Sequence, residues 1–362
     1  MYLIVVFLFG LLHASASLKK HKAFKFAPAK WTPGSGVYDA ARCGLPFHAN
    51  NNVPSTNAKL QRRSKRFCND GERNRKIQGG QAAEEGQFPW AVALARGEAA
   101  KKKFFCTGTL VSKRHVLTAA HCFANEEFAL QLCSCGIVTA KEMELVLNET
   151  TVSIGSICMD DYKLKGLCKS ERRQQFRVKT ATYLHFYNGK CCGNDFALLE
   201  LDVDSEGVPA NLANHICLPQ LNAFEAFSWH NAHPVSYGWG RDMLSNSNLQ
   251  HMPVLQTLQY PNIWSHAACM RHVNSTYSAQ LDDIMCLMDV QGVKDVCEGD
   301  SGGGLTSQQM GTDGIWRWLL LGVVSFGPSC EEEAVRQRVN KPGLYTNMTD
   351  HWNRVNKLMG IL

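Results

Sequence analysis

From Phe88 onward the chain is a series of short strand-like runs separated by turn residues. Runs of this length bounded by turn residues are typical of β-strands. The predicted strands cover residues 88–94, 109–111, 116–118, 152–155, 196–201, 235–238, 255–261, 319–326 and 343–348. Because many short strands favour a β-barrel or a β-sandwich, the sequence predicts an all-β fold.

The end of the chain follows a different pattern. Trp352, Val355 and Met359 recur at the spacing of one helix face, and they follow Thr349 and Asp350, which can cap a helix. We therefore expect a short C-terminal amphipathic helix packed on the β core. With 362 residues, of which 45% are hydrophobic and 19% charged, the chain has enough apolar material for one or two cores.

The chain begins with an apolar run from Met1 to Leu12, followed by Ala-Ser-Ala at 14–16. The run is too short to span a bilayer, and the small residues fit the pattern that a signal peptidase cleaves. We interpret residues 1–16 as a signal peptide of a secreted, extracellular protein; a short hydrophobic anchor is the alternative. Residues 17–66 lack apolar periodicity, so we expect little structure there.

The chain has 15 cysteines. Together with a signal sequence, this number indicates an oxidising compartment and a disulfide framework. The alternative is structural zinc, but the spacings at 133–135 and 191–192 do not make the paired clusters that zinc sites use, so no metal is expected. Glycosylation triplets that begin at Asn148, Asn274 and Asn347 fit the secretory route.

The formal charge of +6 is unevenly distributed along the chain. Residues 1–76 hold 14 Lys and Arg against 3 Asp and Glu, whereas the rest of the chain holds 24 against 29. The basic charge therefore belongs to a solvated leader, and the remainder is acidic by about five charges. This distribution argues against a nucleic-acid or membrane-surface binder.

Catalysis by a serine hydroxyl needs two further side chains, because the hydroxyl is a poor nucleophile at neutral pH. An imidazole must take its proton, and a carboxylate must fix the tautomer of that imidazole. Residues 118–122 (Thr-Ala-Ala-His-Cys), 194–199 (Asn-Asp-Phe-Ala-Leu-Leu) and 299–303 (Gly-Asp-Ser-Gly-Gly) supply these types in the order His, Asp, Ser. Together they resemble the trypsin/chymotrypsin family of serine proteases, and the resemblance covers residues 77–362.

This resemblance implies two antiparallel six-stranded β-barrels, with the active site in the cleft between them. It implies that His121 is the general base and later the acid, that Asp195 orients it, and that Ser301 is the nucleophile. The backbone N–H groups of Gly299 and Ser301 would form the oxyanion hole. A glycine fits at 299 because it can turn its amide toward the developing oxyanion in a conformation closed to most residues.

The segment 75–80 (Arg-Lys-Ile-Gln-Gly-Gly) is similar to the activation site of this family, although Gln78 stands where Val is usual. The resemblance implies a zymogen. Cleavage after Lys76 would free the amine of Ile77, and the resulting ammonium would form a buried ion pair with Asp300.

The resemblance also places a substrate-binding pocket around the nucleophile. Asp295 would be the carboxylate at the bottom of the pocket, Gly327 and Gly343 its small walls, and Ser325 a further substrate-binding residue. Val296 replaces the usual Ser or Ala and offers no hydroxyl to a lysine ammonium. We therefore expect cleavage after Arg and less readily after Lys, because the guanidinium fork can pair with a carboxylate through two bonds.

The disulfides implied by the resemblance join Cys106 to Cys122, Cys269 to Cys286, Cys297 to Cys330, and Cys68 to Cys217. The last pair would tether the cut pro-peptide to the protease. Six cysteines between His121 and Asp195 have no assigned pairing, and Cys43 is left alone in the leader. A convertase-type cut after Arg66 would remove Cys43 and leave an even number of cysteines; the alternative is a solvated basic turn.

The expected organisation is a signal peptide at 1–16, a basic pro-segment at 17–76 and a protease domain at 77–362. The expected partners are protein or peptide substrates, an activating protease and a protein inhibitor, with no nucleic acid, membrane or cofactor. The alternative function is a catalytically silent protease homologue that acts as a binding module, because a fold does not guarantee an activity.

Overall fold

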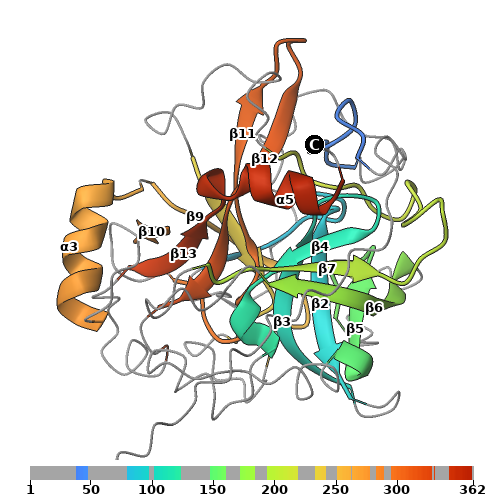
Figure 1. The fold of residues 1–362 in the computed structure, drawn as a ribbon, viewed down its shortest axis with the longest axis horizontal. Helices are drawn as coiled ribbons and strands as arrows, with labels where there is room; N and C mark the ends of the chain where they lie inside the picture. The colour runs from blue at the N-terminus through green and yellow to red at the C-terminus, as the bar shows by residue number, and fades with distance from the viewer. Residues whose placement is uncertain are drawn as a thin grey trace, which may run out of the picture.

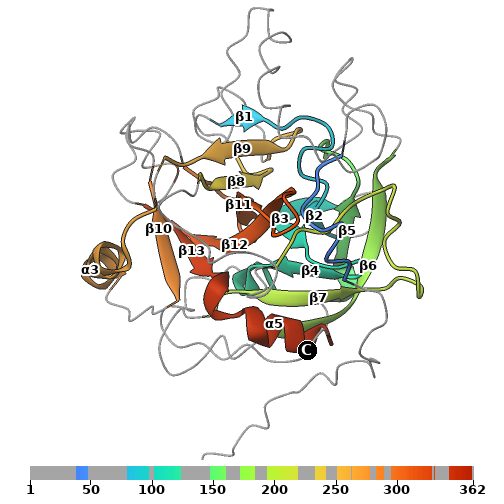
Figure 2. The ribbon, with the colours of Figure 1, turned by 90° about the horizontal axis from the view of Figure 1, so that it is seen from above.

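The structure is a computed structural model, and it describes residues 38–47, 80–97, 102–123, 147–159, 172–183, 194–218, 233–241, 251–261, 263–277, 283–288, 295–327, 330 and 342–360. In these residues most regular structure is β-strand, arranged in two antiparallel sheets (Figure 1, Figure 2). The all-β fold class is confirmed. In this part of the chain no helix is long and apolar enough to cross a membrane.

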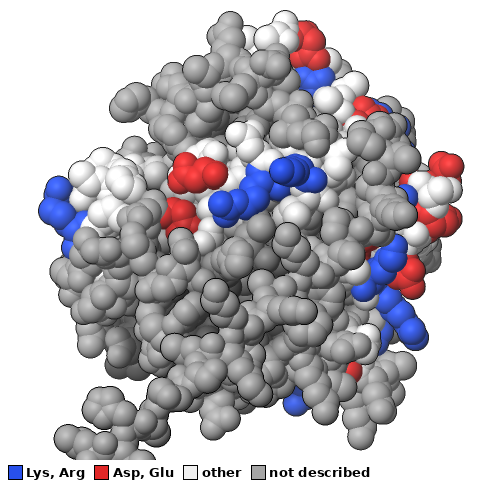
Figure 3. Space-filling model, viewed as in Figure 1, with Lys and Arg blue, Asp and Glu red and all other residues white. Residues whose placement is uncertain are grey.

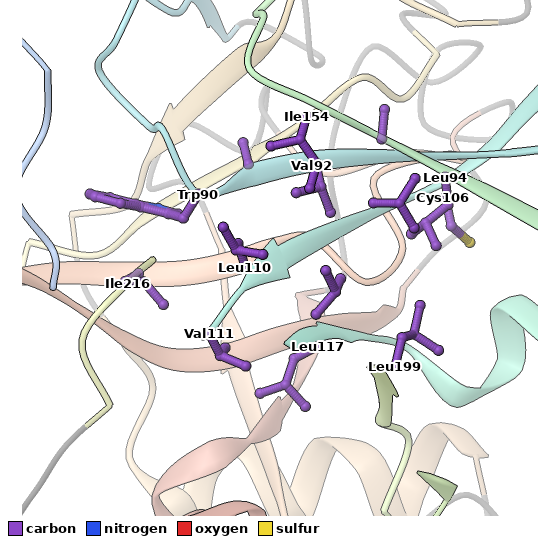
Figure 4. Close-up of a cluster of buried hydrophobic side chains, with 14 of the residues drawn as sticks. Trp90, Val92, Leu94, Cys106, Leu110, Val111, Leu117, Ile154, Leu199 and Ile216 are labelled. Carbon is purple, nitrogen blue, oxygen red and sulfur yellow. The ribbon is translucent and has the colours of Figure 1, made fainter. Parts of the chain in front are cut away.

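The first sheet is a closed barrel with the strand order β2-β3-β4-β7-β6-β5. Its strands are β2 (Ala91–Arg96), β3 (Lys103–Leu110), β4 (His115–Thr118), β5 (Thr150–Ile154), β6 (Gln174–Tyr183) and β7 (Ala197–Leu201). Val92, Ile154 and Leu199 come from three of these strands and are fully buried inside the barrel, close to Leu110 and Leu117 (Figure 4). Closure pairs every strand with two neighbours, so the barrel has no free edge.

The second sheet has seven strands in the order β1-β9-β8-β11-β12-β13-β10. They are β1 (Gln81–Ala82), β8 (Val235–Gly238), β9 (Gln256–Gln259), β10 (Ile284–Leu287), β11 (Gly304–Met310), β12 (Trp316–Phe326) and β13 (Gly343–Asn347). It differs from the expected six-stranded barrel in two ways: in the described residues its strand order ends at β1 and β10 without closing, and β1 adds to it through β9. A strand of two exposed residues carries no alternating pattern, so the sequence does not reveal it.

The C-terminal helix is present as α5 (Trp352–Leu358). Trp352, Val355 and Met359 are buried in the same cluster as barrel residues, and the helix lies beside β7 (Figure 2). The expected caps are wrong: Asn347 accepts from the amide of Thr349 and caps a preceding 3₁₀ turn, η6 (Met348–Asp350). The amphipathic spacing thus predicts the helix but not the turn before it. A second helix, α3 (His266–Tyr277), was not expected.

One part of the leader is folded onto the rest of the chain, contrary to the expectation of little structure in residues 17–66. The segment 38–47 lies against the chain near Cys217 and β12 (dark blue in Figure 1). The amide of Gly44 donates to His215 O at 2.9 Å, and the amide of Trp318 donates to Gly44 O at 2.9 Å. The side chain of Asn214 donates to Arg42 O at 2.6 Å, so distant parts of the chain satisfy the backbone of the leader.

The disulfides Cys106–Cys122, Cys269–Cys286 and Cys297–Cys330 are formed in the structure. The pairing of Cys217 with Cys68 is wrong, because Cys217 is bonded to Cys43, with 4.8 Å between their Cα atoms. The docked leader segment brings Cys43 to this position, while Cys68 lies outside the described residues. The reason for a cut after Arg66 therefore fails, since Cys43 has a partner and such a cut would not release it.

Candidate active site

The predicted base and its carboxylate come together at the ends of two paired strands. His121 lies in a short 3₁₀ helix, η2 (Ala120–Phe123), directly after β4, and Asp195 lies just before β7. Strands β4 and β7 are antiparallel neighbours, so these ends meet. The Nδ1 of His121 lies 2.7 Å from Asp195 Oδ2, and the His121 amide donates to Asp195 Oδ1 at 3.0 Å.

Asp195 is held by further donors from the second sheet. Its side chain is buried, and Ser325 of β12 donates its hydroxyl proton to Asp195 Oδ2 at 2.5 Å. Thr346 of β13 donates to Asp195 O at 3.1 Å. The structure therefore places Ser325, expected only as a substrate-binding residue, in contact with the carboxylate. Thr346 was missed, because a strand threonine has no local signal that distinguishes this contact from ordinary packing.

The backbone before Asp195 is also fixed. Asn194 has a φ of 59°, in the left-handed region that residues with a side chain rarely adopt. Asp283 accepts the Asn194 amide at 2.8 Å, and the same carboxylate oxygen contacts His351 Nε2 at 2.9 Å. Asp283 and His351 thus position the turn that carries Asp195, and neither was predicted from the sequence.

The electrostatics of the pair favour an ionised carboxylate beside a basic imidazole. Burial alone would lower the pKa of His121, but the charge and hydrogen bond of Asp195 outweigh it and raise that pKa. Burial alone would raise the pKa of Asp195, but His121 and Ser325 outweigh it and lower that pKa. This arrangement holds the imidazole in the tautomer that leaves Nε2 able to accept a proton.

Ser301 is anchored against β3 and against the short helix that carries His121. Its carbonyl accepts the amide of Thr107 at 2.9 Å and lies 3.8 Å from the sulfur of Cys122, the neighbour of His121. Gly302 has a φ of +82°, and a Cβ there would lie 2.8 Å from the nitrogen of Ala119. A glycine at 302 is therefore required for the serine segment to approach the histidine segment so closely.

Gly299 has a φ of +95°, in the region that favours glycine, as predicted from the sequence. A Cβ at this position would lie 2.8 Å from the ring of Phe104. The carbonyl of Gly299 accepts from Thr107 Oγ1 at 2.9 Å, and this bond fixes the orientation of the adjoining peptide. The turn before Ser301 therefore depends on glycine for both its conformation and its space.

Asp300 is fully buried. Its carboxylate accepts the amides of Gly240 at 2.8 Å and Cys297 at 2.9 Å, yet burial raises its pKa to about 7. An ammonium group placed here would offset that cost. Lys76 and Ile77, the predicted activation site, lie outside the described residues.

The predicted pocket residues also come together. Asp295 is fully buried and accepts the amide of Val296 at 2.8 Å. A Cβ on Gly343 would lie 2.6 Å from Asp295 Oδ1, and a Cβ on Gly327 would lie 3.5 Å from Gly343 Cα. Gly343 therefore has no space for a side chain beside the carboxylate, whereas a Cβ at 327 would make only an ordinary contact with Gly343.

Two tyrosines beneath this carboxylate were not predicted. Tyr260 donates its hydroxyl proton to Asp295 Oδ1 at 3.1 Å, and Tyr345 Oη lies 2.9 Å from Tyr260 Oη. Aromatic residues in or beside strands usually indicate only core packing, so the sequence carries no signal for these hydroxyls.

One group of side chains near the pocket consists of residue types that can bind a metal ion. In the described residues the only group of potential metal ligands is Cys297, Glu298 and Cys330. Its two cysteines form a disulfide, so their sulfurs are not thiolate ligands.

On the face seen in Figure 3, basic and acidic side chains of the described residues lie close to one another.

Comparison with known proteins agrees with this geometry. A family model, Trypsin, matches residues 77–353. Trypsin-like protease try-5 of Caenorhabditis elegans is 31% identical over 256 residues, which are 67% of this chain and 74% of that protein. Coagulation factor XII of Cavia porcellus is 28% identical over 85% of this chain but only 44% of that protein. Transmembrane protease serine 11B of Homo sapiens is 26% identical over 93% of this chain and 72% of that protein. The chain therefore belongs to the trypsin family of serine proteases.

Proposed function

We propose that this chain is a secreted serine endopeptidase, made as a zymogen, that hydrolyses peptide bonds after Arg and less readily after Lys. The observation that carries the proposal is the short contact between His121 Nδ1 and Asp195 Oδ2, at 2.7 Å, beside the anchored segment of Ser301. Family membership alone leaves open a catalytically silent homologue, whereas an imidazole oriented by Asp195, with the Ser301 backbone held beside Cys122, supports catalysis.

In the proposed mechanism the Oγ of Ser301 attacks the substrate carbonyl carbon and passes its proton to His121 Nε2. The N–H groups of Gly299 and Ser301 stabilise the oxyanion. His121 then gives the proton to the leaving amine, which departs as the C–N bond breaks. Water attacks the acyl-enzyme with the same base, releases the acid and restores Ser301. Asp195 keeps its charge throughout and stabilises the imidazolium.

The choice of substrate rests on Asp295 at the base of the pocket. A buried carboxylate gains most from a cationic side chain, because its desolvation is then compensated by pairing. The glycines at 327 and 343 support this role because they leave room for a long side chain. Val296 offers no hydroxyl to an ammonium, which favours Arg over Lys.

Activation would follow a cut after Lys76, with 17–76 as the pro-segment and 77–362 as the protease domain. The new ammonium of Ile77 would pair with Asp300, whose burial and raised pKa support the need for a cation. The leader would stay attached after the cut through the Cys43–Cys217 disulfide. An activating protease and a protein inhibitor are the proposed partners besides protein substrates.

Secretion rests on residues 1–16 as a signal peptide. One relative is named as a transmembrane protease, so a retained hydrophobic anchor is the competing possibility. Sequencing the amino terminus of protein from the culture medium and from the cell fraction tests it: protein in the medium that starts after Ala16 supports secretion, and cell-bound protein that starts at Met1 contradicts it.

The enzymatic proposal is tested by profiling the secreted, activated chain on a peptide library. Cleavage after Arg and Lys is expected, and Ser301→Ala should be secreted normally but lose several powers of ten in turnover. Equal activity in this variant would refute the mechanism. No cleavage by the activated parent would favour the silent homologue.

A further inference from the structure

The carboxylate of Asp295 rests on a chain of two tyrosine hydroxyls. Tyr260 follows β9 directly, and Tyr345 lies on β13, so the two come from different strands of the second sheet. Tyr260 donates to Asp295 Oδ1 at 3.1 Å, and Tyr345 Oη lies 2.9 Å from Tyr260 Oη. Because the Tyr260 proton goes to the carboxylate, the proton in the second bond comes from Tyr345.

The hydroxyl of Tyr260 is firmly held in this position. Both tyrosines are fully buried, and their rings pack edge to face, with centroids 6.1 Å apart and an interplanar angle of 84°. Burial, reinforced by the neighbouring charge of Asp295, raises the pKa of Tyr260 well above its usual range, so the phenol keeps its proton. The carboxylate therefore has a permanent donor below it.

Oδ1 of Asp295 consequently has both its lone-pair directions in use. One accepts the amide of Val296 at 2.8 Å, and the other accepts the hydroxyl of Tyr260. A guanidinium gains its advantage over an ammonium by bonding to both oxygens of a carboxylate at once. An arginine in this pocket must compete with Tyr260 for Oδ1, whereas a lysine ammonium needs only one oxygen.

We propose that Tyr260 is a specificity-determining residue of the primary pocket, which acts through Asp295 and keeps the preference for Arg over Lys small. The inference rests on the proposed function and opposes the effect of Val296 within the same pocket. Tyr345 strengthens the bond from Tyr260 to Asp295, because a hydroxyl that accepts a hydrogen bond becomes a stronger donor.

The test is Tyr260→Phe, which keeps the ring and removes the donor. The ratio of kcat/KM for Arg over Lys peptides should rise about tenfold, the effect of one additional charge-assisted bond to Arg. Tyr345→Phe should raise the ratio by less. Tyr237→Phe is the matched control, because Tyr237 is equally buried but its hydroxyl bonds to Thr109 at 2.7 Å; its ratio should not change.

A second readout measures how tightly the pocket binds a cation and not how fast a substrate reacts. Benzamidine presents a forked amidinium, whereas n-butylamine presents an ammonium, so Tyr260→Phe should strengthen inhibition by benzamidine relative to n-butylamine. Active-site titration corrects all rates for the fraction of folded enzyme. If Tyr260→Phe is not secreted, Tyr345→Phe is the deciding variant: a higher Arg-to-Lys ratio of kcat/KM supports the role of Tyr260, and an unchanged or lower ratio contradicts it.

The outcomes separate the two proposals. An unchanged or lower Arg-to-Lys ratio in the tyrosine variants, with a parent that cleaves after basic residues, overturns the role of Tyr260 and leaves the proposed function intact. A parent that cleaves after neither Arg nor Lys overturns the proposed function, and the role of Tyr260 with it.

Discussion

Replacing Ser325 with alanine removes one donor from the carboxylate that orients His121. Asp195 has three donors: the amide and the ring of His121 and the hydroxyl of Ser325. The hydroxyl lies 2.5 Å from Oδ2, and both side chains are buried. Ser325→Ala therefore tests how strongly the second sheet supports the histidine–aspartate pair on the first.

The magnitude follows from the charge of the acceptor. A hydrogen bond to a charged group contributes about 1.5–3 kcal/mol to the free energy of unfolding. The pKa of Asp195 is lowered in the folded chain, so this stabilisation is present above the pKa of the unfolded carboxyl and is lost as the pH falls through the folded value. At neutral pH the variant should lose about 1.5–3 kcal/mol, and the loss should shrink in strong acid.

The assay is urea unfolding at neutral pH and in strong acid, with both proteins carrying Ser301→Ala to prevent self-digestion. Thr306→Val is the control, because Thr306 is equally buried and its hydroxyl donates to a neutral carbonyl, Val235 O, at 2.9 Å. Its loss should not depend on the ionisation of a carboxylate. The reasoning is refuted if Ser325→Ala costs nothing at neutral pH, or costs the same amount in acid.

Three further results are expected. Asp295→Ser should lower kcat/KM on Arg peptides by about 10² to 10⁴, because it leaves the substrate cation without its buried partner; a smaller loss, measured by peptide hydrolysis, would contradict the pocket assignment. Lys76→Gln should leave an inactive zymogen after treatment with a trypsin-like activator, and full activity in the uncleaved chain would exclude the proposed activation. After cleavage at Lys76, mass spectrometry should find the peptide that contains Cys43 only after reduction, since it is bonded to Cys217; its release without reductant would contradict the observed pairing.

Local motifs in the sequence predicted much of this molecule. The run around Ser301 needs glycines at fixed positions, and Gly299 and Gly302 indeed have positive φ values. Short apolar runs predicted most strands of both sheets, and the signal is clearest where a strand is buried over its whole length, as in β4 and β7. These signals are local, and their chemistry is contained in a few adjacent residues.

Features that depend on docking could not be predicted in this way. The predicted partner of Cys217 was wrong because the resemblance chose Cys68 by its place near the activation site, whereas the docked leader brings Cys43 to Cys217. Tyr260 was missed because its role depends on a residue 35 positions away, Asp295. Asp283 escaped notice for the same reason, since it acts on the turn at Asn194, 89 positions away.

Under the proposed activation by a cut after Lys76, the docked leader fixes the order in which this protein matures. Phe47 and Gly86, on either side of the proposed cleavage site, are joined by a backbone hydrogen bond of 2.8 Å, and Cys43 of the same leader segment is bonded to Cys217. While the chain is continuous, the leader finds its place as an intramolecular partner at high effective concentration. Once the chain is cut, the same contacts hold two polypeptides together, and a reduced, unfolded enzyme would have to reassemble from separate pieces. Folding and disulfide formation must therefore precede the proposed cleavage. Protein produced from Ile77 onward would lack Cys43, so Cys217 would have no cysteine to pair with as it does here.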